Sequence, residues 1–396
     1  MSGPLHNVRV IDLTTIGMGP YATQTLGNLG ADVIKVEAPP AGDLIRGQAP
    51  GRHPDMSPLY LNLNRNKRSI VLDLKIPQAR DVLTKLIDGA DVFVSNVRMK
   101  SMERLGLGYG KLAARNPRLI YCSLVGASQR GPYAARAAFD DLIQGASGLA
   151  YLEGRMAGEP HYTPAWIADQ TVGLVAVYAI TAALYQRERT GKGECIEVPM
   201  LESMVEFVMT PHLAAHTFQP PQAAAGYTRL FHRKPYKTLD GYLCGGPYSV
   251  EQWKRFFDIA GLAHLKGSTK YATREAVAAH VAELYALFAD VLRSRTTAEW
   301  VGVLEQADIP VMPMHTLESV QDDPHLKAVG FFRDVDHPSE GRIRTMANPT
   351  RWASVEEHPA RPAPRLGEHG HEILRELAYS EAEIDALVAC RATAPA

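Results

Sequence analysis

Short apolar runs alternate with amphipathic segments along the first 200 residues. The apolar runs at 8–13, 32–37, 69–74, 91–95 and 119–124 have the length of strands and are rich in valine and isoleucine. Helical patterns and turns that contain glycine or proline separate them. Strands that alternate with helices predict a doubly wound α/β fold, in which helices cover both faces of a mostly parallel sheet.

The pattern changes around residues 210–235. A helix over about 170–189 ends at Gly191, and the stretch around Pro220 and Pro221 is typical of a linker. Beyond it, Asp240-Gly241 is a strong hairpin signal within a smaller α+β unit. The last six residues are expected to fray. We predict a large domain (1–200), a linker (201–230), a small α+β domain (231–311), a second linker (312–345) and a C-terminal return to the large domain (346–396).

Composition and charge exclude several classes of protein. The formal net charge of −1 gives no reason to expect nucleic acid or a charged membrane surface as a partner. The longest apolar stretch, 174–184, is shorter than the ~18 residues that a membrane span needs, and no leader pattern is present. The four cysteines form neither a Cys-x-x-Cys pair nor a zinc-ligand spacing. We therefore expect a cytoplasmic protein without a metal site.

One acidic residue interrupts the apolar approach to the 170–189 helix. Asp169 has two interpretations that do not exclude each other. It can cap the helix, because an aspartate there accepts a hydrogen bond from a free helix N–H group. A partly buried carboxylate at a helix start can also attack a thioester, with nearby N–H groups holding the oxyanion.

A second acidic pair, Asp140-Asp141, begins another apolar helix. Capping explains at least one of the two acids. Asp140 and Gln144 are one helical turn apart, and either can lie beside Asp169 and adjust its reactivity.

The sequence resembles the class III coenzyme A transferases, a family that includes formyl-CoA and carnitine-CoA transferases and shares its fold with the alpha-methylacyl-CoA racemases. The matching positions run in order along nearly the whole chain. They include Val10-Ile11-Asp12-Leu13, Gly19-Pro20, Gly30-Ala31-Asp32-Val33-Ile34-Lys35-Val36-Glu37, Asn66-Lys67-Arg68-Ser69, Glu103-Arg104-Leu105-Gly106, Asn116-Pro117-Arg118, Asp140, Gln144, Asp169, Gly191-Lys192-Gly193, Ile309-Pro310 and Leu366-Gly367-Glu368-His369.

The resemblance implies a role for individual residues. Asp169 matches the nucleophilic aspartate that forms mixed anhydrides and an aspartyl-CoA thioester. Asp140 matches its acidic neighbour, and Arg104 matches the arginine that lies against the adenine ring. Further positions match the CoA site: Ile16, Gly17 and Met18 at the thioester end, and Leu72, Lys75, Asn96 and Met200 along the nucleotide. The resemblance also implies a Rossmann-like large domain and an interlocked homodimer threaded through the two linkers. CoA is then a substrate, and no prosthetic group is expected.

This chain departs from the family pattern at three places. Formyl-CoA transferases carry glutamine where Gly17 stands, and their tetraglycine loop corresponds to Gly245-Gly246-Pro247-Tyr248 here. Formate and oxalate are therefore not the expected substrates. The racemases carry a histidine where Phe139 stands, and racemisation needs an acid/base pair across the α-carbon.

Substrate choice rests on basic residues. The stretch 229–237 is dense in cations, which indicates either a solvated loop or a site in which His232 or Arg233 binds the second carboxylate of a small dicarboxylic acid. Arg46 and Arg130 can assist, since arginine binds carboxylates in a bidentate manner. We expect CoA transfer from a succinyl-CoA-type donor to a small carboxylic acid, with a dicarboxylate favoured.

Three other functions compete with this hypothesis. An acyl-CoA racemase or isomerase is disfavoured by Phe139. A nicotinamide dehydrogenase needs Gly-x-Gly-x-x-Gly after the first strand, and Ala22 stands at the third glycine. A non-catalytic acyl-CoA binder has no reason to keep Asp169.

Overall fold

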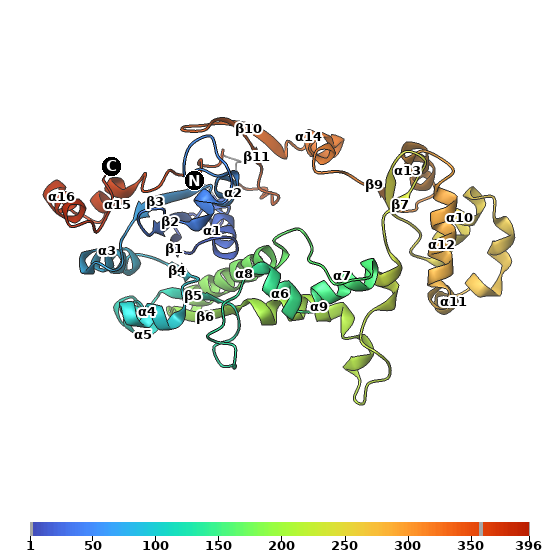
Figure 1. The fold of residues 1–396 in the computed structure, drawn as a ribbon, viewed down its shortest axis with the longest axis horizontal. Helices are drawn as coiled ribbons and strands as arrows, with labels where there is room; N and C mark the ends of the chain where they lie inside the picture. The colour runs from blue at the N-terminus through green and yellow to red at the C-terminus, as the bar shows by residue number, and fades with distance from the viewer. Residues whose placement is uncertain (1–2, 356–358, 396) are drawn as a thin grey trace. The chain divides into compact units, whose positions relative to one another are not determined.

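A sheet of six parallel strands organises the larger of two structural units in the computed structural model (Figure 1), which describes residues 3–355 and 359–395. Its strands are β1 (Arg9–Leu13), β2 (Asp32–Glu37), β3 (Lys67–Val71), β4 (Val92–Ser95), β5 (Ile120–Val125) and β6 (Glu194–Pro199), in the order β3-β2-β1-β4-β5-β6. All five neighbouring pairs are parallel, which confirms the predicted fold class. The strand order reverses between β1 and β4, and in such sheets the crevice at this switch point is where ligands bind.

Alternate strand residues enter two separate cores, because successive side chains of a strand point to opposite faces. Val10 and Val92 belong to the core on one face, and Ile11 and Phe93 belong to the other. Helices that supply the first core are α1 (Met18–Asn28), α8 (Ile167–Thr190) and α9 (Met200–His212). The second core takes residues from α3 (Pro77–Asp88), α4 (Met99–Leu105), α5 (Tyr109–Arg115), α15 (Gly370–Glu376) and α16 (Glu381–Ala389).

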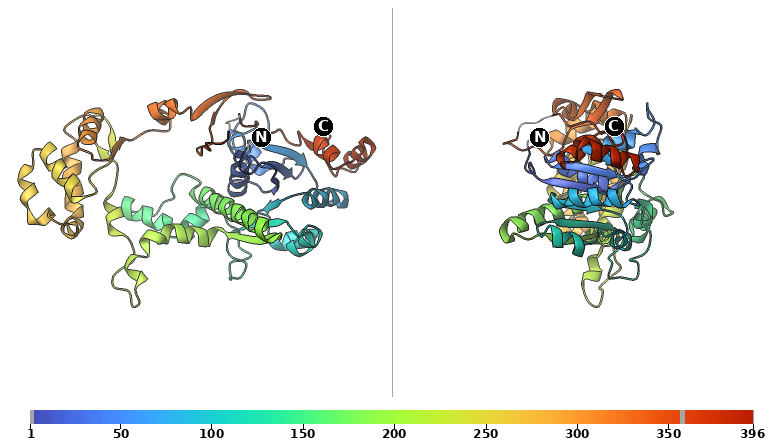
Figure 2. Two further views of the ribbon diagram at one scale, coloured as in Figure 1. Left: turned by 180° about the vertical axis from the view of Figure 1, so that it is seen from behind. Right: turned by 90° about the vertical axis from the view of Figure 1, so that its left-hand side faces the viewer.

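The C-terminal residues return to β3, at the edge of this sheet. Helix α15 lies beside β3 (Figure 2), and Ala392 is fully buried. The Thr393 hydroxyl donates to the carbonyl of Val71 over 2.7 Å, and the Asp73 N–H donates to the carbonyl of Ala392 over 3.0 Å. The expectation that the tail frays is wrong for the described residues, since these bonds anchor residues 392 and 393.

Shorter elements complete this unit, which consists of Met1–Met209 with Phe331–Ala396. They are η1 (Leu44–Gly47), α2 (Pro58–Leu63), α6 (Asp140–Ala146), α7 (Leu149–Ala157) and the antiparallel hairpin of β10 (Phe332–His337) and β11 (Gly341–Met346). The two segments predicted as linkers thus carry regular structure: 201–230 begins inside α9, and 312–345 holds most of the hairpin.

The second unit, Thr210–Gly330, contains a three-stranded antiparallel sheet and an aromatic core. Its principal elements are β7 (Tyr236–Lys237), β8 (Tyr242–Gly245), α10 (Val250–Ile259), α11 (Arg274–Ala279), α12 (Val281–Leu292), α13 (Thr297–Gln306), β9 (Val311–Pro313) and α14 (Pro324–Ala328). The predicted Asp240-Gly241 turn joins β7 to β8, where the Thr238 N–H donates to the carbonyl of Gly241 over 3.0 Å. Trp253, Phe256 and Phe288 pack together in the core.

Helix α8 is long and apolar enough to span a bilayer by length and composition alone. Buried core helices of soluble proteins share that property, so it is weak support for a membrane span. Ala168, Val172, Ala176 and Ile180 of this helix are fully buried in the first core, where α8 packs against α1.

Candidate active site

The first turn of α8 carries Asp169. The helix begins at Ile167, so Asp169 is its third residue and not its N-cap. Asp140 at the start of α6 supplies the missing cap: its Oδ2 accepts the N–H groups of Ala168 and Asp169, each over 2.9 Å. The interpretation of Asp169 as the helix cap is therefore wrong. Free N–H groups in a first turn need acceptors, and a carboxylate from another helix meets that need here.

Capping by Asp140 leaves the Asp169 carboxylate unpaired. The residue is 9% exposed, and no hydrogen bond or ion pair of its side-chain oxygens occurs among the described residues. Burial, with a further contribution from the charge of Asp140, raises the pKa of Asp169 to about 7. A carboxylate stripped of water and of hydrogen-bond donors is more basic and more nucleophilic than one in solution.

Gln144 fixes Asp140 and the chain segment that leads into α8. Its Nε2 donates to Asp140 Oδ1 over 2.6 Å, and its Oε1 accepts the N–H of Thr163 over 2.9 Å. The side chain is 2% exposed. The structure thus brings together the three residues predicted as catalytic, with Gln144 holding Asp140 and Asp140 holding the turn that presents Asp169.

The loop after β1 lies directly against the Asp169 carboxylate. A Cβ atom added to Gly17 would lie 2.1 Å from Asp169 Oδ2, so only glycine fits at this position without displacing the carboxylate. Ile16 has a φ of +73°, which is unfavourable for a β-branched residue. Such strain, about 1–3 kcal/mol, persists only where surrounding contacts impose it. The predicted thioester-end residues Ile16, Gly17 and Met18 therefore lie beside the predicted nucleophile.

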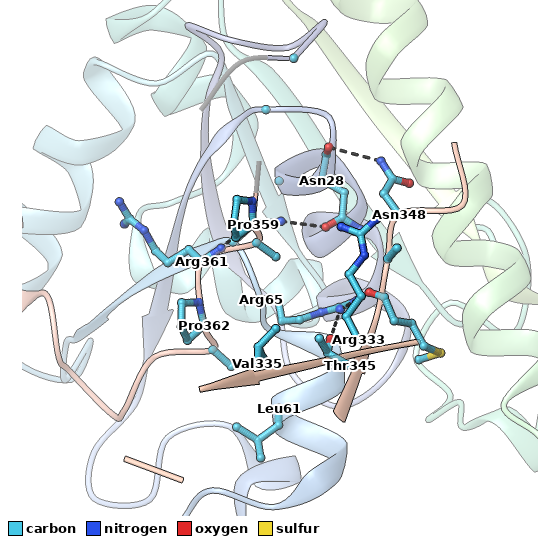
Figure 3. A pocket seen from close by; sticks show the side chains of 18 of the residues that line it. Asn28, Leu61, Arg65, Arg333, Val335, Thr345, Asn348, Pro359, Arg361 and Pro362 are labelled. Atoms are coloured by element: carbon cyan, nitrogen blue, oxygen red, sulfur yellow. Dashed lines mark hydrogen bonds between the residues drawn. The ribbon is translucent and has the colours of Figure 1, made fainter. Parts of the chain in front are cut away.

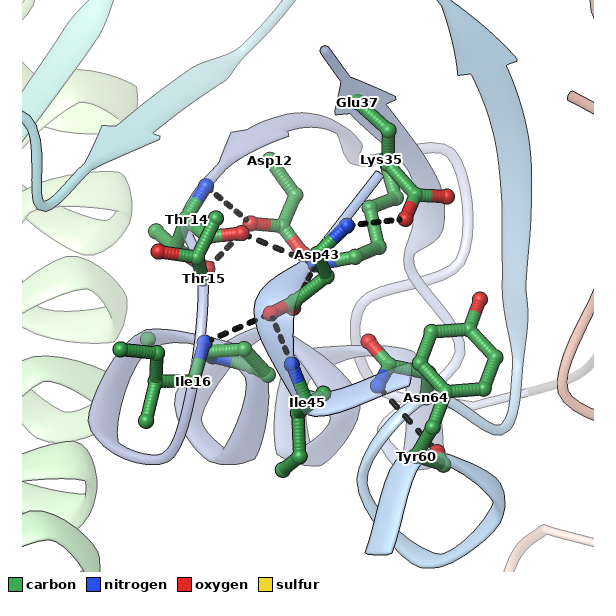
Figure 4. A network of polar contacts seen from close by, with 12 residues as sticks. Asp12, Thr14, Thr15, Ile16, Lys35, Glu37, Asp43, Ile45, Tyr60 and Asn64 are labelled. Atoms are coloured by element: carbon green, nitrogen blue, oxygen red, sulfur yellow. Dashed lines mark hydrogen bonds and ion pairs between the residues drawn. The ribbon is translucent and has the colours of Figure 1, made fainter. Parts of the chain in front are cut away.

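Buried polar contacts impose the conformation of this loop (Figure 4). Asp43 Oδ1 accepts the N–H of Ile16 over 2.9 Å, and Lys35 Nζ donates to Asp43 Oδ2 over 2.8 Å and to the carbonyl of Thr14 over 2.9 Å. Asp12 Oδ1 accepts both the N–H and the hydroxyl of Thr14. Ion pairs without exposure to water hold their geometry tightly, so the loop is fixed before substrate binds.

Asn96 fixes the same loop from the other side of the switch point. It follows β4, and it exchanges two hydrogen bonds with the backbone of Thr15, over 3.1 and 2.9 Å. The residue was predicted to line the nucleotide, and the structure shows that it joins the loops after β1 and β4. This is the crevice in which ligands of such sheets bind.

A pocket of about 940 Å³ opens onto Asp169 within the larger unit. A volume of this order suits an organic ligand of moderate size. Among its lining residues are Ile16, Asp140, Gln144 and Asp169 from the predicted site, and Arg65, which the sequence analysis did not select.

The remaining residues predicted to bind the nucleotide differ in their surroundings. Lys75 and Arg104 are exposed, so their side chains are open to a ligand. Leu72 and Met200 are 1% and 3% exposed and pack in the cores on opposite faces of the sheet. Both residues offer almost no open surface, so their role in lining the nucleotide stays a prediction.

The cations predicted to bind the substrate differ in their surroundings. Arg46 is 1% exposed and forms a bidentate pair with Glu37, with both distances 2.8 Å, so the expectation that it binds substrate is not supported. Arg130 lies in an exposed loop. His232 and Arg233 belong to the second unit, where Arg233 lies over the ring of Tyr248.

Comparisons with known proteins agree with this geometry. A family model for CoA-transferase family III matches residues 5–370. A succinyl-CoA:glutarate CoA-transferase from Homo sapiens is 33% identical over 97% of this chain and 89% of the relative. A formyl-CoA:oxalate CoA-transferase from Rhodopseudomonas palustris is 32% identical over 95% of this chain and 94% of the relative. The crystal structure of a CAIB/BAIF family protein from Brucella suis aligns with a TM-score of 0.80 at 31% identity, covering 95% of this chain and all of that one.

The match to the family model spans nearly the whole chain, including both sides of the Asp169 pocket. The relatives described above, which are 33% and 32% identical over 97% and 95% of this chain, are both named as CoA-transferases. The chain therefore belongs to CoA-transferase family III and is a CoA-transferase that acts on acyl-CoA thioesters and carboxylic acids.

Proposed function

We propose that Asp169 is the covalent relay of the transfer. One observation carries this proposal: the Asp169 carboxylate is buried, has no ion-pair partner among the described residues, and faces a pocket beside a glycine that leaves no room for a side chain. A carboxylate with a structural role alone would be expected to have a hydrogen-bond donor or a cation against it.

The reaction divides into two matched halves. Asp169 Oδ attacks the thioester carbonyl of the donor, the C–S bond breaks, and CoA leaves as the thiolate while a mixed anhydride remains. The thiolate then attacks the aspartyl Cγ, which releases the donor acid as a carboxylate and leaves an aspartyl-CoA thioester. The acceptor carboxylate attacks the same Cγ, and CoA leaves again. Attack of the thiolate on the acyl carbon of the acceptor restores the Asp169 carboxylate and forms the new acyl-CoA.

The surroundings of Asp169 favour these steps. Water is the competing nucleophile for each acylated intermediate, and the 9% exposure of the residue limits its access. The attack is favoured by a carboxylate that is already desolvated and held against a fixed loop. Asp140 raises the basicity of Asp169 through its charge and, through its two backbone hydrogen bonds, sets the turn that presents it.

A succinyl-CoA-type donor and a small dicarboxylate acceptor fit this chain best. The human relative is named for succinyl-CoA and glutarate. Relatives named for formyl-CoA and oxalate are nearly as similar in sequence, yet the expected glutamine of that group would place a Cβ 2.1 Å from Asp169 Oδ2 in this loop. Racemisation is disfavoured because Phe139, which is 55% exposed, offers no acid/base group where the racemases carry histidine.

Trapping of the intermediate tests the covalent scheme. Incubation with succinyl-CoA followed by hydroxylamine or borohydride should place a mass change on the peptide that contains Asp169. Asp169→Asn is the matched control, because it keeps the shape of the side chain and removes the nucleophile. An active wild-type enzyme without an adduct on that peptide, or an Asp169→Asn variant that transfers CoA at the wild-type rate, would refute the scheme. A panel of acceptor acids, assayed with one donor, then ranks the substrates.

Three further expectations belong with this proposal. The division into domains and linkers at residues 200, 230, 311 and 345, the interlocked homodimer and the cytoplasmic location stay predictions. Sedimentation of the purified protein tests the dimer: the sedimentation coefficient of a 43.4 kDa monomer would contradict it.

A further inference from the structure

Arg65 is a buried cation without a counter-charge. It is 9% exposed, and no carboxylate pairs with it among the described residues. Its Nη1 donates to Thr345 Oγ1 and to the carbonyl of Met346 on β11, and Arg65 also lines a neighbouring pocket of about 730 Å³, the one drawn in Figure 3. Its Nε has no hydrogen-bond partner among the described residues. Burial lowers the pKa of Arg65, which records the cost of keeping the charge there.

Arg46 shows how this fold treats a buried guanidinium that serves the structure alone. Glu37 binds it through two parallel hydrogen bonds, and the Tyr60 hydroxyl and the carbonyl of Pro364 accept two more. An unpaired buried charge is costly, and such charges are normally matched by an opposite one. We therefore infer that a ligand supplies the negative charge that pairs with Arg65.

The position of Arg65 indicates which ligand. Arg65 is the one Lys, Arg or His side chain among the described residues that line the 940 Å³ pocket of Asp169. The other charged residues that line the pocket are three acids, Asp140, Asp141 and Asp169. A substrate that presents one carboxyl group to Asp169 has a single cationic position in the pocket for a second negative group.

We propose that Arg65 is the specificity-determining residue that binds the second carboxylate of a dicarboxylic substrate. The inference rests on the proposed function, because it assumes that CoA transfer takes place at Asp169. Arg65 takes no part in bond making or breaking. A guanidinium binds a carboxylate through two parallel hydrogen bonds, and this preference accounts for an arginine here.

The test compares two acceptors that differ only at the far end. Glutarate and valerate have the same chain length, and a methyl group replaces the second carboxylate in valerate. Both acceptors meet the same aspartyl-CoA intermediate when the donor is succinyl-CoA, so the ratio of their kcat/KM values does not depend on the donor step. We expect the wild type to prefer glutarate. Arg65→Met should reduce that ratio by about 10- to 100-fold, mainly through a higher KM for glutarate.

Two further variants separate recognition from folding. Thr345→Val removes one anchor of Arg65 and keeps its charge, so the preference for glutarate should stay within about threefold of wild type. If Arg65→Met does not fold, Arg65→Lys carries the test, because lysine lacks the planar pair of donors. That variant should lower the preference at least threefold.

The outcomes separate the two proposals. A wild type that transfers CoA while Arg65→Met, or Arg65→Lys in its place, keeps the full preference for glutarate overturns the role of Arg65 alone. Equal losses for glutarate and valerate assign Arg65 to structure and also overturn the inference. A wild type that transfers CoA to neither acid refutes the proposed acceptor class itself, and the inference with it.

Discussion

The unpaired carboxylate of Asp169 should cost the protein stability, in a manner that depends on pH. In the folded protein its pKa is raised to about 7, against an ordinary value of 3.8. A carboxyl with a raised pKa stabilises the fold fully at pH values below 3.8, and that stabilisation is lost as pH rises through 7. At ~1.36 kcal/mol per pH unit, the loss between pH 5 and pH 8 is roughly 2–3 kcal/mol. Asp169→Asn cannot ionise and should escape it.

Urea unfolding at pH 5 and pH 8 measures this difference. The asparagine amide adds a cost of its own in the buried site, yet that cost is the same at both pH values. The free energy of unfolding of Asp169→Asn, relative to wild type, should therefore increase by roughly 2–3 kcal/mol from pH 5 to pH 8. Asp141→Asn, at an exposed neighbour of Asp140, should show no such increase. Parallel pH profiles for wild type and Asp169→Asn would mean that the carboxylate is hydrated, and the argument for its reactivity would fail.

Three other variants test the site. Asp140→Asn removes a negative charge beside Asp169, so the acid limb of the profile of kcat/KM against pH should move to lower pH; an unmoved limb would contradict the coupling. Gly17→Ala should reduce kcat at least ~100-fold by displacing the carboxylate, while Gly110→Ala, where nothing lies within 4 Å, should leave kcat unchanged. Lys35→Met leaves the buried carboxylate of Asp43 without its counter-charge and should lower stability by about 3–5 kcal/mol in chemical denaturation. A change below about 1 kcal/mol would refute a tight ion pair.

Periodicity was enough to predict the parallel sheet, because a strand covered on both faces must be apolar throughout. The nucleophile was also recognisable, since Asp169 stands in an otherwise apolar stretch. Its capping role was predicted wrongly because a helix start accepts any acid that reaches it in space, and Asp140 is 29 residues away along the chain. Such a partner follows from tertiary packing and not from local sequence.

The buried charges show where sequence reasoning stopped short. Lys35 stands inside a strand between Ile34 and Val36, a pattern that signals a buried ion pair, and it pairs with Asp43 at 0% exposure. Lys67, the first residue of β3, lies between two polar residues and is also paired at 0% exposure, with Asp12. Arg65 stands two residues before Lys67 and has no such pair within the part of the chain that the structure describes. The sequence cannot distinguish a paired arginine from an unpaired one, so Arg46 was selected and Arg65 was missed.

The return of the C-terminal segment to β3 affects how the protein is made. Ile373, Leu374, Ile384 and Leu387 belong to the same core as the helix that follows β3, so that face stays open until residues 370–389 have left the ribosome. At about 5–20 residues per second, translation takes on the order of ten seconds or more to pass from residue 209 to residue 393. During that time the nascent sheet carries an apolar surface that the C-terminal helices cover later.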